Sequence, residues 1–478
     1  MIRRDKVQAL VDYLAGRPQP FNPLTLGGLL HLADQYVTRV SEIVVAEACF
    51  NEHLAPEEVL ARVETAFDHN LETVRLGMDR DSQSFLMGRV GYELTRQPGQ
   101  ITNDSFLDRA ISLTLAAQVG NHLVGLAPCA GTGDACVFSG LTAAMLEAYP
   151  REEVWPAVAV MLRVGTFFRA GKTTTGCNME GLGAGACGTA AALVELAGGG
   201  PREMDRAMVL ALSPTISVPC TPRVMVPGLC ATHIGGALML GQLAAGLALK
   251  TSIPVNVPVD VMLALAARVH QVSARTIVPE VIRYMEAYFK SDPRVDRYIE
   301  EQVKSEEEQR RAAVAGRARE EVGRLAELAN PVIKPFGEVV VGGSSQAVGS
   351  PTNTARIAHA LAGDATIQKV LIELYPELFA RRAINVPGIL MGAVYGASTA
   401  DSQSYHQILN ELPRLGITVE IKEANEPQLQ RVTLETSAGR VIVDARNRGG
   451  GRLALVEAIP SLEAALEAAQ KLGIVIVP

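Results

Sequence analysis

Residues 176–193 read GCNMEGLGAGACGTAAAL, and residues 213–238 read SPTISVPCTPRVMVPGLCATHIGGAL. Three cysteines in this stretch, Cys177, Cys220 and Cys230, stand within two residues of Gly or Pro, which indicates loop-like surroundings. They are far apart and form no CxxC pair, so the tight ligand pairs of a zinc ribbon are excluded. Dispersed thiolates suit an iron–sulfur cluster in which one iron stays open to substrate. Buried, inert free cysteines are the alternative at this point.

The composition is that of a large globular protein. The chain has 478 residues, of which 48% are hydrophobic and 20% charged, so it is long enough for two or three domains and is not disordered. Its net charge is −7 and no basic stripe is present, which argues against nucleic acid as a partner. Seven cysteines in so long a chain do not indicate a secreted disulfide framework, and no signal-peptide core follows the charged N-terminal residues.

One apolar segment raises the question of a membrane. Residues 234–249, IGGALMLGQLAAGLAL, carry no charge but are fewer than the roughly 20 residues that a spanning helix needs. Their Gly content and the prolines that follow predict a tightly packed core helix. We therefore expect a soluble, cytoplasmic protein.

The spacing of apolar residues divides the chain in two. Residues 1–75 and 251–329 have helical periodicity, with the helix at Ala55–Phe67 begun by Pro56 and the second region rich in charges of both signs. Residues 331–478 read as strands and helices in succession, with a turn between two strands at 437–439. The sequence predicts an α+β multidomain protein with a mostly helical domain, residues 1–330, and a smaller α/β domain, residues 331–478.

The motifs resemble those of a known family. GCNMEGLGAGACGTAAAL is similar to GCQ-x-EVG-x-ACSMAAA in the alpha region of the iron–sulfur-dependent L-serine dehydratases. PCTPRVMVPGLC resembles that family's TCDPV-x-GLVQVPC, and LAPCAGTGDACVFSGLTAAM resembles AAPTCGSAGILPGVL, so the likeness covers roughly residues 40–240. GGSSQAVGS, ELYPELF and NRGGGRLAL resemble segments of the family's beta region, which here follows the alpha region, as in a permuted fusion.

The resemblance implies a cofactor and a reaction. Cys177, Cys220 and Cys230 match the family's three ligands to a 4Fe–4S cluster. The cluster's open iron would act as a Lewis acid in removing water and ammonia from a small β-hydroxy amino acid such as serine, with no pyridoxal phosphate. A homodimer is expected, because the family forms dimers.

Other motif positions supply candidates for proton transfer and substrate binding. The general base is sought among His233, Lys172 and Glu180; Glu180 could equally orient the site. Arg89 could hold a substrate carboxylate, and the small-residue loops allow backbone N–H groups to approach an anion. The candidate substrate-binding residues are Ser84, Arg89, Asn121, Cys129, Gly131, Thr132, Ser344, Ser345 and Gln346. His53 and His69 are expected to be surface or capping residues.

Departures from the family pattern leave alternatives open. Gln346 and Ala347 replace the His and Thr of the family's SSSHT, and residues 230–234 lack the Arg and Asn of its CIERN. These changes weaken the prediction that L-serine is the substrate more than the prediction that a cluster is bound. A cysteine desulfidase and a non-catalytic cluster-binding protein therefore remain alternatives. A nucleotide-binding P-loop is disfavoured, because five residues rather than four separate Gly165 from Gly171 in GTFFRAGKTTTG. A P-loop also follows a strand, and residues 157–162, Ala-Val-Ala-Val-Met-Leu, are only a possible strand.

Overall fold

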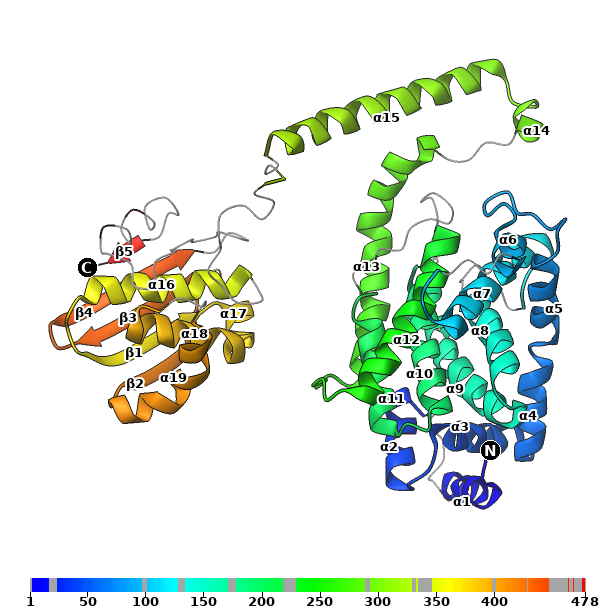
Figure 1. Cartoon of the computed structure of the whole chain (residues 1–478), viewed down its shortest axis with the longest axis horizontal. Helices are drawn as coiled ribbons and strands as arrows, with labels where there is room; N and C mark the ends of the chain where they lie inside the picture. Colours follow the sequence, from blue (N-terminus) through cyan, green and yellow to red (C-terminus); the bar gives the residue numbers. More distant parts are fainter. Residues whose placement is uncertain are drawn as a thin grey trace. The chain divides into compact units, whose positions relative to one another are not determined.

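The chain forms two compact units, Met1–Glu320 and Glu321–Pro478 (Figure 1). The division lies inside a charged helix, α15 (Glu301–Leu328), whose C-terminal end is close to the predicted domain boundary at residue 330. The computed structural model describes residues 2–16, 24–96, 101–127, 134–170, 178–216, 218, 229–288, 293–328, 332–333, 346–397, 401–427, 429–446, 463, 467 and 475–477.

The first unit is built from helices, as the sequence predicts. Their bounds are α1 (Arg4–Ala15), α2 (Leu26–Gln35), α3 (Val40–Glu52), α4 (Pro56–Thr65), α5 (Asp68–Gly77), α6 (Val90–Arg96), α7 (Ser105–Leu123), α8 (Asp134–Ala148), α9 (Arg151–Ala170), α10 (Gly185–Leu196), α11 (Pro201–Leu212), α12 (Ile234–Lys250), α13 (Val259–Met285) and α14 (Pro293–Asp296). Two π-helical segments, η1 (Asn178–Ala184) and η2 (Leu229–His233), open α10 and α12, and a 3₁₀ turn, η3 (Glu286–Tyr288), follows α13.

Helix α10 forms the centre of this unit and packs against α9, α11 and α12. Its Ala and Cys side chains are fully buried, so neighbouring backbones approach closely. At Gly241 of α12, an added Cβ would lie 2.5 Å from Cβ of Thr189 on α10. At Gly140 of α8, it would lie 2.4 Å from Cα of Thr114 on α7. Glycine is therefore required at these two helix crossings, because a larger side chain would force the helices apart.

Helix α12 is packed on one face only. Its residues Ala237, Leu238 and Ala248 are fully buried, whereas Met239 and Leu243 on the outer face are 47% and 58% exposed. By length and composition, Ala231–Lys250 is the one helix of the described chain that could cross a membrane, with 44% of its most apolar window buried. The prediction of a tightly packed core helix is therefore correct for the inner face and wrong for the outer one.

Helix α9 contradicts one prediction from the sequence, that of a strand before the P-loop-like motif. Residues 157–162, Ala-Val-Ala-Val-Met-Leu, were a possible strand before the P-loop-like motif. They lie inside α9, where Ala157, Val158 and Met161 are fully buried. A P-loop follows a strand, so the structure removes that part of the case for nucleotide binding.

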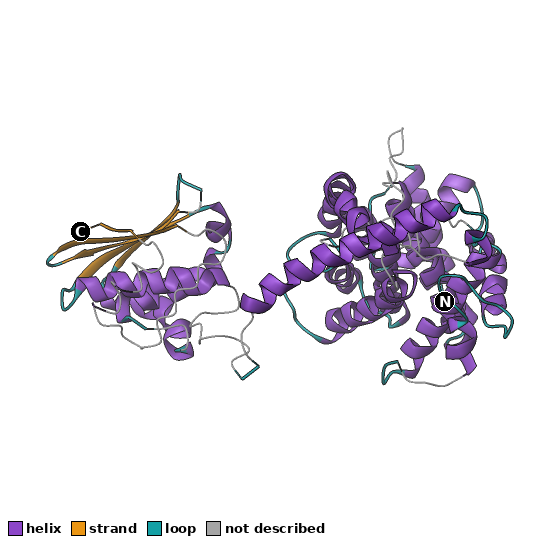
Figure 2. Ribbon diagram, turned by 90° about the horizontal axis from the view of Figure 1, so that it is seen from above, coloured by secondary structure: helices purple, strands orange, loops and turns teal. Residues whose placement is uncertain are grey.

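The second unit is an α/β domain, which confirms the predicted fold class. Its mixed sheet has the order β2-β1-β3-β4-β5, with β1 parallel to β2 and the other pairs antiparallel. Figure 2 shows the described helices of this unit on one side of the sheet. The bounds are α16 (Gln346–Ala362), β1 (Ile367–Leu374), α17 (Pro376–Ala380), α18 (Arg382–Tyr395), α19 (Ser402–Leu415), β2 (Thr418–Glu423), β3 (Leu429–Thr436), β4 (Gly439–Arg446) and β5 (Val475–Val477).

The core of this domain lies between the sheet and helices α16 and α18. Ile357 of α16, Ile372 of β1, Ile389 of α18 and Leu434 of β3 are fully buried in it. The predicted turn joins β3 to β4, and Gly439 adopts a φ of 139° that only glycine accepts readily.

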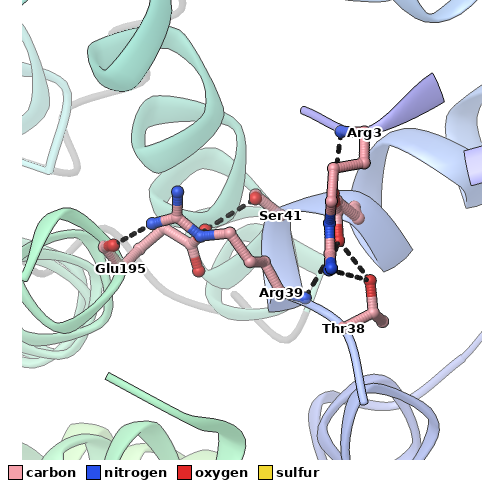
Figure 3. Close-up of polar contacts among 6 residues, drawn as sticks. Arg3, Thr38, Arg39, Ser41 and Glu195 are labelled. Atoms are coloured by element: carbon pink, nitrogen blue, oxygen red, sulfur yellow. Dashed lines mark hydrogen bonds and ion pairs between the residues drawn. The ribbon is translucent and has the colours of Figure 1, made fainter. Parts of the chain in front are cut away.

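A buried carboxylate fastens the N-terminal residues to α3. Glu42 accepts hydrogen bonds from the Arg3 backbone N–H at 2.8 Å and the Arg3 guanidinium at 2.7 Å, and also from the Thr38 hydroxyl (Figure 3). It also accepts the Arg39 backbone N–H at 3.1 Å, as the third residue of a capped helix commonly does. Burial alone would raise the pKa of Glu42, but these hydrogen bonds outweigh it and lower the pKa to about 2.

A second ion pair joins α3 to the C-terminal end of α10. Arg39 lies 2.9 Å from Glu195, and the Ser41 hydroxyl donates to the same carboxylate at 2.6 Å (Figure 3). Glu195 is 1% exposed, and burial raises its pKa. The N-terminal helices are thus attached to the central helix by buried polar contacts as well as by apolar packing.

The Glu42 contacts predict a pH dependence of stability. The pKa of Glu42 is lower in the folded chain than the ordinary 4.5, so its carboxylate stabilises the fold above that value. This contribution is lost as the pH falls from 4.5 towards about 2.

The difference in unfolding free energy between wild type and Glu42→Gln should therefore be larger near pH 6 than near pH 3 in denaturant titrations. Glu57→Gln, which changes an exposed ion pair with Arg4, is the control and should show little difference at either pH. An equal effect of Glu42→Gln at both pH values would contradict this account.

Candidate metal and substrate site

Two π-helical segments meet where α10 and α12 begin. η1 and η2 contact each other, and η1 also contacts α8, α9 and α12. At Gly185, an added Cβ would lie 3.0 Å from Cβ of Ala237 and 3.1 Å from Cγ2 of Val137, so the first turns of α8, α10 and α12 are neighbours. Single-turn π-helices are rare and concentrate at functional sites. The positive ends of three helix dipoles also favour a negatively charged group nearby.

Two of the predicted cluster ligands stand next to or within these π-helical segments along the chain. Cys177 is the residue before Asn178, the first residue of η1, and Cys230 is the second residue of η2. Several predicted residues lie outside the described part of the chain; these are Cys129, Gly131, Thr132, Lys172, Cys177, Cys220, Ser344 and Ser345. For Glu180, Cys230 and Gln346 the backbone is described, within η1, η2 and α16, but the side chain is not.

The described cysteines are of a different kind. Cys49, Cys136 and Cys187 are buried and form no disulfide within the described residues. Cys187 lies within α10 with no exposed surface, and burial raises the pKa of its thiol. It is therefore a protonated packing residue rather than a thiolate ligand.

His233 closes η2 and has an unused ring nitrogen. Its Nδ1 atom is buried and has no hydrogen-bond partner in the described part of the chain. Burial lowers the pKa of the imidazole, so the neutral form predominates at neutral pH. A buried, unpartnered nitrogen is costly and indicates an interaction that the described residues do not supply.

A chain of hydrogen bonds connects Ser84 to Cys136 through two residues of α7. The Cys136 thiol donates to Oε1 of Gln118 at 2.7 Å, and Nε2 of Gln118 lies 2.7 Å from Nε2 of His122. Nδ1 of His122 lies 2.5 Å from the Ser84 hydroxyl. In a neutral ring one nitrogen donates and the other accepts, so Gln118 and Ser84 together engage both ring nitrogens of His122. Desolvation lowers the pKa of His122, in agreement with a neutral ring.

Ser84 is used within the protein. Its hydroxyl oxygen accepts the backbone N–H groups of Leu86 and Met87, and its backbone pairs with Gly88 in an isolated antiparallel bridge. The side chain is buried, so Ser84 holds His122 in place and offers no free surface to a substrate.

Arg89 and Asn121 also have structural contacts. The guanidinium of Arg89 is exposed and lies over the ring of Tyr92, 5.6 Å from its centroid. Asn121 accepts the Leu126 backbone N–H at 2.9 Å and so shapes the turn that follows α7. His69 contacts the Gly125 carbonyl at 2.9 Å, and His53 ends α3 in a left-handed conformation, as expected for capping residues.

Sequence reasoning missed His122, Gln118 and Cys136. The four residues of the hydrogen-bond chain come from three separate segments, which only the fold brings together. One sequence signal could have indicated the contact between Gln118 and His122. The two residues are four positions apart and so share a face of a helix.

At the start of α8, Asp134 forms a buried ion pair with α9. Its side chain is 0% exposed and lies 2.8 Å from the guanidinium of Arg169, which is 26% exposed. The pair holds the C-terminal end of α9 against the first turn of α8. Predicted site residues precede α8 and follow α9 along the chain, in segments that lie outside the described residues.

Comparison with known proteins adds no family assignment. No protein-family model matches the chain, and no curated protein matches it. The likeness to the iron–sulfur dehydratases therefore rests on the motif segments alone.

The buried pair predicts a large cost for removing its cation. Arg169→Met leaves the carboxylate of Asp134 without its guanidinium, which for buried pairs costs about 3–5 kcal/mol of unfolding free energy. The matched control is Arg109→Met, whose pair with Glu147 is 34% and 49% exposed and should contribute about 1 kcal/mol or less. Denaturant unfolding of both variants measures the difference. Equal destabilisation by the two substitutions would contradict the assignment.

Proposed function

We propose that the protein is an iron–sulfur-dependent lyase that removes water and ammonia from a small β-hydroxy amino acid. The observation that supports it most is the contact between η1 and η2. One of these segments begins directly after Cys177, and the other contains Cys230 and ends at His233. A metal-ligand region and a candidate base thus belong to one place in the fold.

The residues present are of the type that such a cluster needs. Cys177, Cys220 and Cys230 would hold it through thiolates, next to the dipole ends of helices that favour negative charge. When bound, the cluster supplies a Lewis-acidic iron that makes hydroxide a better leaving group.

The chain itself supplies the base, and His233 is the best candidate. Its neutral imidazole can accept the substrate's α-proton at Nδ1, the nitrogen without a partner in the described residues. The electron pair left at the α-carbon expels the β-hydroxyl group as hydroxide, which takes back the proton held by the imidazole and leaves as water. The resulting enamine takes up water and gives a 2-oxo acid and ammonia. Lys172 and Glu180 stay as rival bases.

His122 is less suited to this role. Its Nε2 atom is hydrogen-bonded to Gln118 and its Nδ1 atom to Ser84, so neither nitrogen is free to take a proton from a substrate. We infer that His122 positions the segment around Ser84 rather than reacting with substrate.

The expected homodimer also has some support. The outer face of α12 exposes Met239 and Leu243 side by side at helical spacing, and an uncovered apolar face favours packing against another surface. The same helix begins at η2, so a partner there would border the proposed site.

The cluster prediction is tested by iron content. Protein purified without oxygen should contain iron and acid-labile sulfide, and Cys177→Ser, Cys220→Ser and Cys230→Ser should each lose most of both. Cys187→Ala is the matched control, because this cysteine is a buried packing residue and its loss should leave the iron content unchanged. Full iron loading after the triple Ser substitution would show that these cysteines are not ligands.

Turnover and the role of His233 are tested together. L- and D-serine, threonine, cysteine and 2,3-dihydroxy acids are assayed anaerobically for 2-oxo acid, with agents that trap pyridoxal phosphate expected to have no effect. Because Gln346 replaces a family residue, we expect another β-hydroxy amino acid to be preferred over L-serine, by a large factor if the changed site leaves polar groups unpaired. On the best substrate, His233→Gln should lower kcat by about 10²–10⁴ with iron retained.

The outcomes separate the alternatives. Sulfide release from cysteine alone would favour the desulfidase, and no turnover by iron-loaded protein would favour a non-catalytic cluster-binding protein. A larger loss of kcat in His122→Gln than in His233→Gln would contradict the choice of base.

A further inference from the structure

A cavity lies at the opposite end of α12 from η2. It has a volume of about 550 Å³ and is bounded by α2, by the first turns of α11 and by the connection from α12 to α13. Cavities of a few hundred Å³ are the usual size for small-molecule sites. Helix α12 has 17 residues, so its two ends are about 25 Å apart, and the cavity is separate from the region of His233.

One side of the cavity carries guanidinium groups. Arg202 and Arg206 lie on α11 and line it. Arg206 donates one Nη to the Ala248 carbonyl, while its Nε is buried and has no acceptor in the described part of the chain. Arg202 makes an exposed contact of 3.3 Å with Asp34, which is weak in water. These two guanidinium groups suit a carboxylate ligand.

Another lining residue carries the opposite charge. Asp205 accepts the Val259 backbone N–H at 3.1 Å, the one hydrogen bond described for its side chain. Next to it, Asp260 accepts the Gly27 backbone N–H at 3.0 Å. Burial raises the pKa of Asp205, and the nearby charge of Asp260 adds to the effect. A cation placed in the cavity would relieve this unfavourable charge.

The remaining lining is mixed, with polar residues such as His31, Ser252 and Asn256 beside an apolar part, and two kinds of ligand are disfavoured. Leu30, Ile253, Pro254 and Val255 provide a surface for a hydrocarbon group. No three metal-ligating side chains gather within the described residues, which argues against a metal ion here. The helix N-termini at the cavity are already capped by Asp260 and Asp205, which argues against a bare anion such as phosphate.

We propose that this cavity binds a free α-amino acid with an apolar side chain. The carboxylate of the ligand pairs with Arg202 and Arg206, its ammonium group faces Asp205, and its side chain contacts Leu30 and Val255. The site does not rest on the proposed lyase activity, because it is built from other residues at the other end of α12.

The experiment is isothermal titration calorimetry of the full chain with three matched probes. L-leucine carries both charges, 4-methylpentanoate lacks the ammonium group, and 3-methylbutylamine lacks the carboxylate. L-leucine should bind saturably at one site per chain, and each analogue should bind at least about tenfold more weakly, which is 1.4 kcal/mol.

Substitutions locate the binding. Asp205→Asn keeps an oxygen that can accept the Val259 N–H but removes the charge, and Arg202→Ala removes an exposed guanidinium without disturbing the core. Each should weaken L-leucine binding by about tenfold or more. Arg62→Ala, which removes an exposed arginine of α4 outside the cavity, is the control and should bind as wild type does.

Three results would overturn the proposal. The first is no saturable binding of L-leucine, and the second is equal binding of L-leucine and the two analogues. The third is unchanged binding by both Asp205→Asn and Arg202→Ala. None of these depends on iron content or turnover, so failure here is distinguishable from failure of the proposed lyase.

Discussion

Close packing of α10 against α12 is the constraint on which the helical unit depends. Gly241 lets the backbone of α12 approach Thr189 and Ala186, and the Ala-rich surface of α10 leaves no room for larger groups. Because the two helices are held at this distance, the π-helical segments that open them are held together as well. The proposed metal site would therefore depend on small residues in the core, some distance along the chain from the predicted ligands Cys177 and Cys230.

Much of the fold follows from local patterns in the sequence. Helical spacing predicts α4 and α13, and the turn at 437–439 follows from strand alternation and Gly439. The strand reading of residues 157–162 failed because a buried helix and a buried strand both present continuous apolar runs. Tertiary packing decides between them, and α9 is covered by α3, α8 and α10.

In the candidate site, too, some residues could be predicted from the sequence and others could not. The cysteines and His233 could be selected from motifs because they cluster along the chain around residues 177–233. The hydrogen-bond chain from Ser84 through His122 to Cys136 could not, since its members are chemically ordinary until the fold places them within hydrogen-bond distance. The predicted role of Ser84 at the substrate likewise took no account of its burial, which no single sequence displays.

The central claim is that the segments before α10 and α12 bring Cys177 and Cys230 to one place. Mild oxidation of metal-free protein, followed by peptide mapping, tests this directly, because a disulfide forms only when the two Cα atoms come within about 7 Å. The account predicts that Cys177 pairs with Cys230, with Cys49 and Cys187 left as free thiols in the core. Three unlinked thiols at positions 177, 220 and 230 under conditions that oxidise exposed cysteines would contradict it.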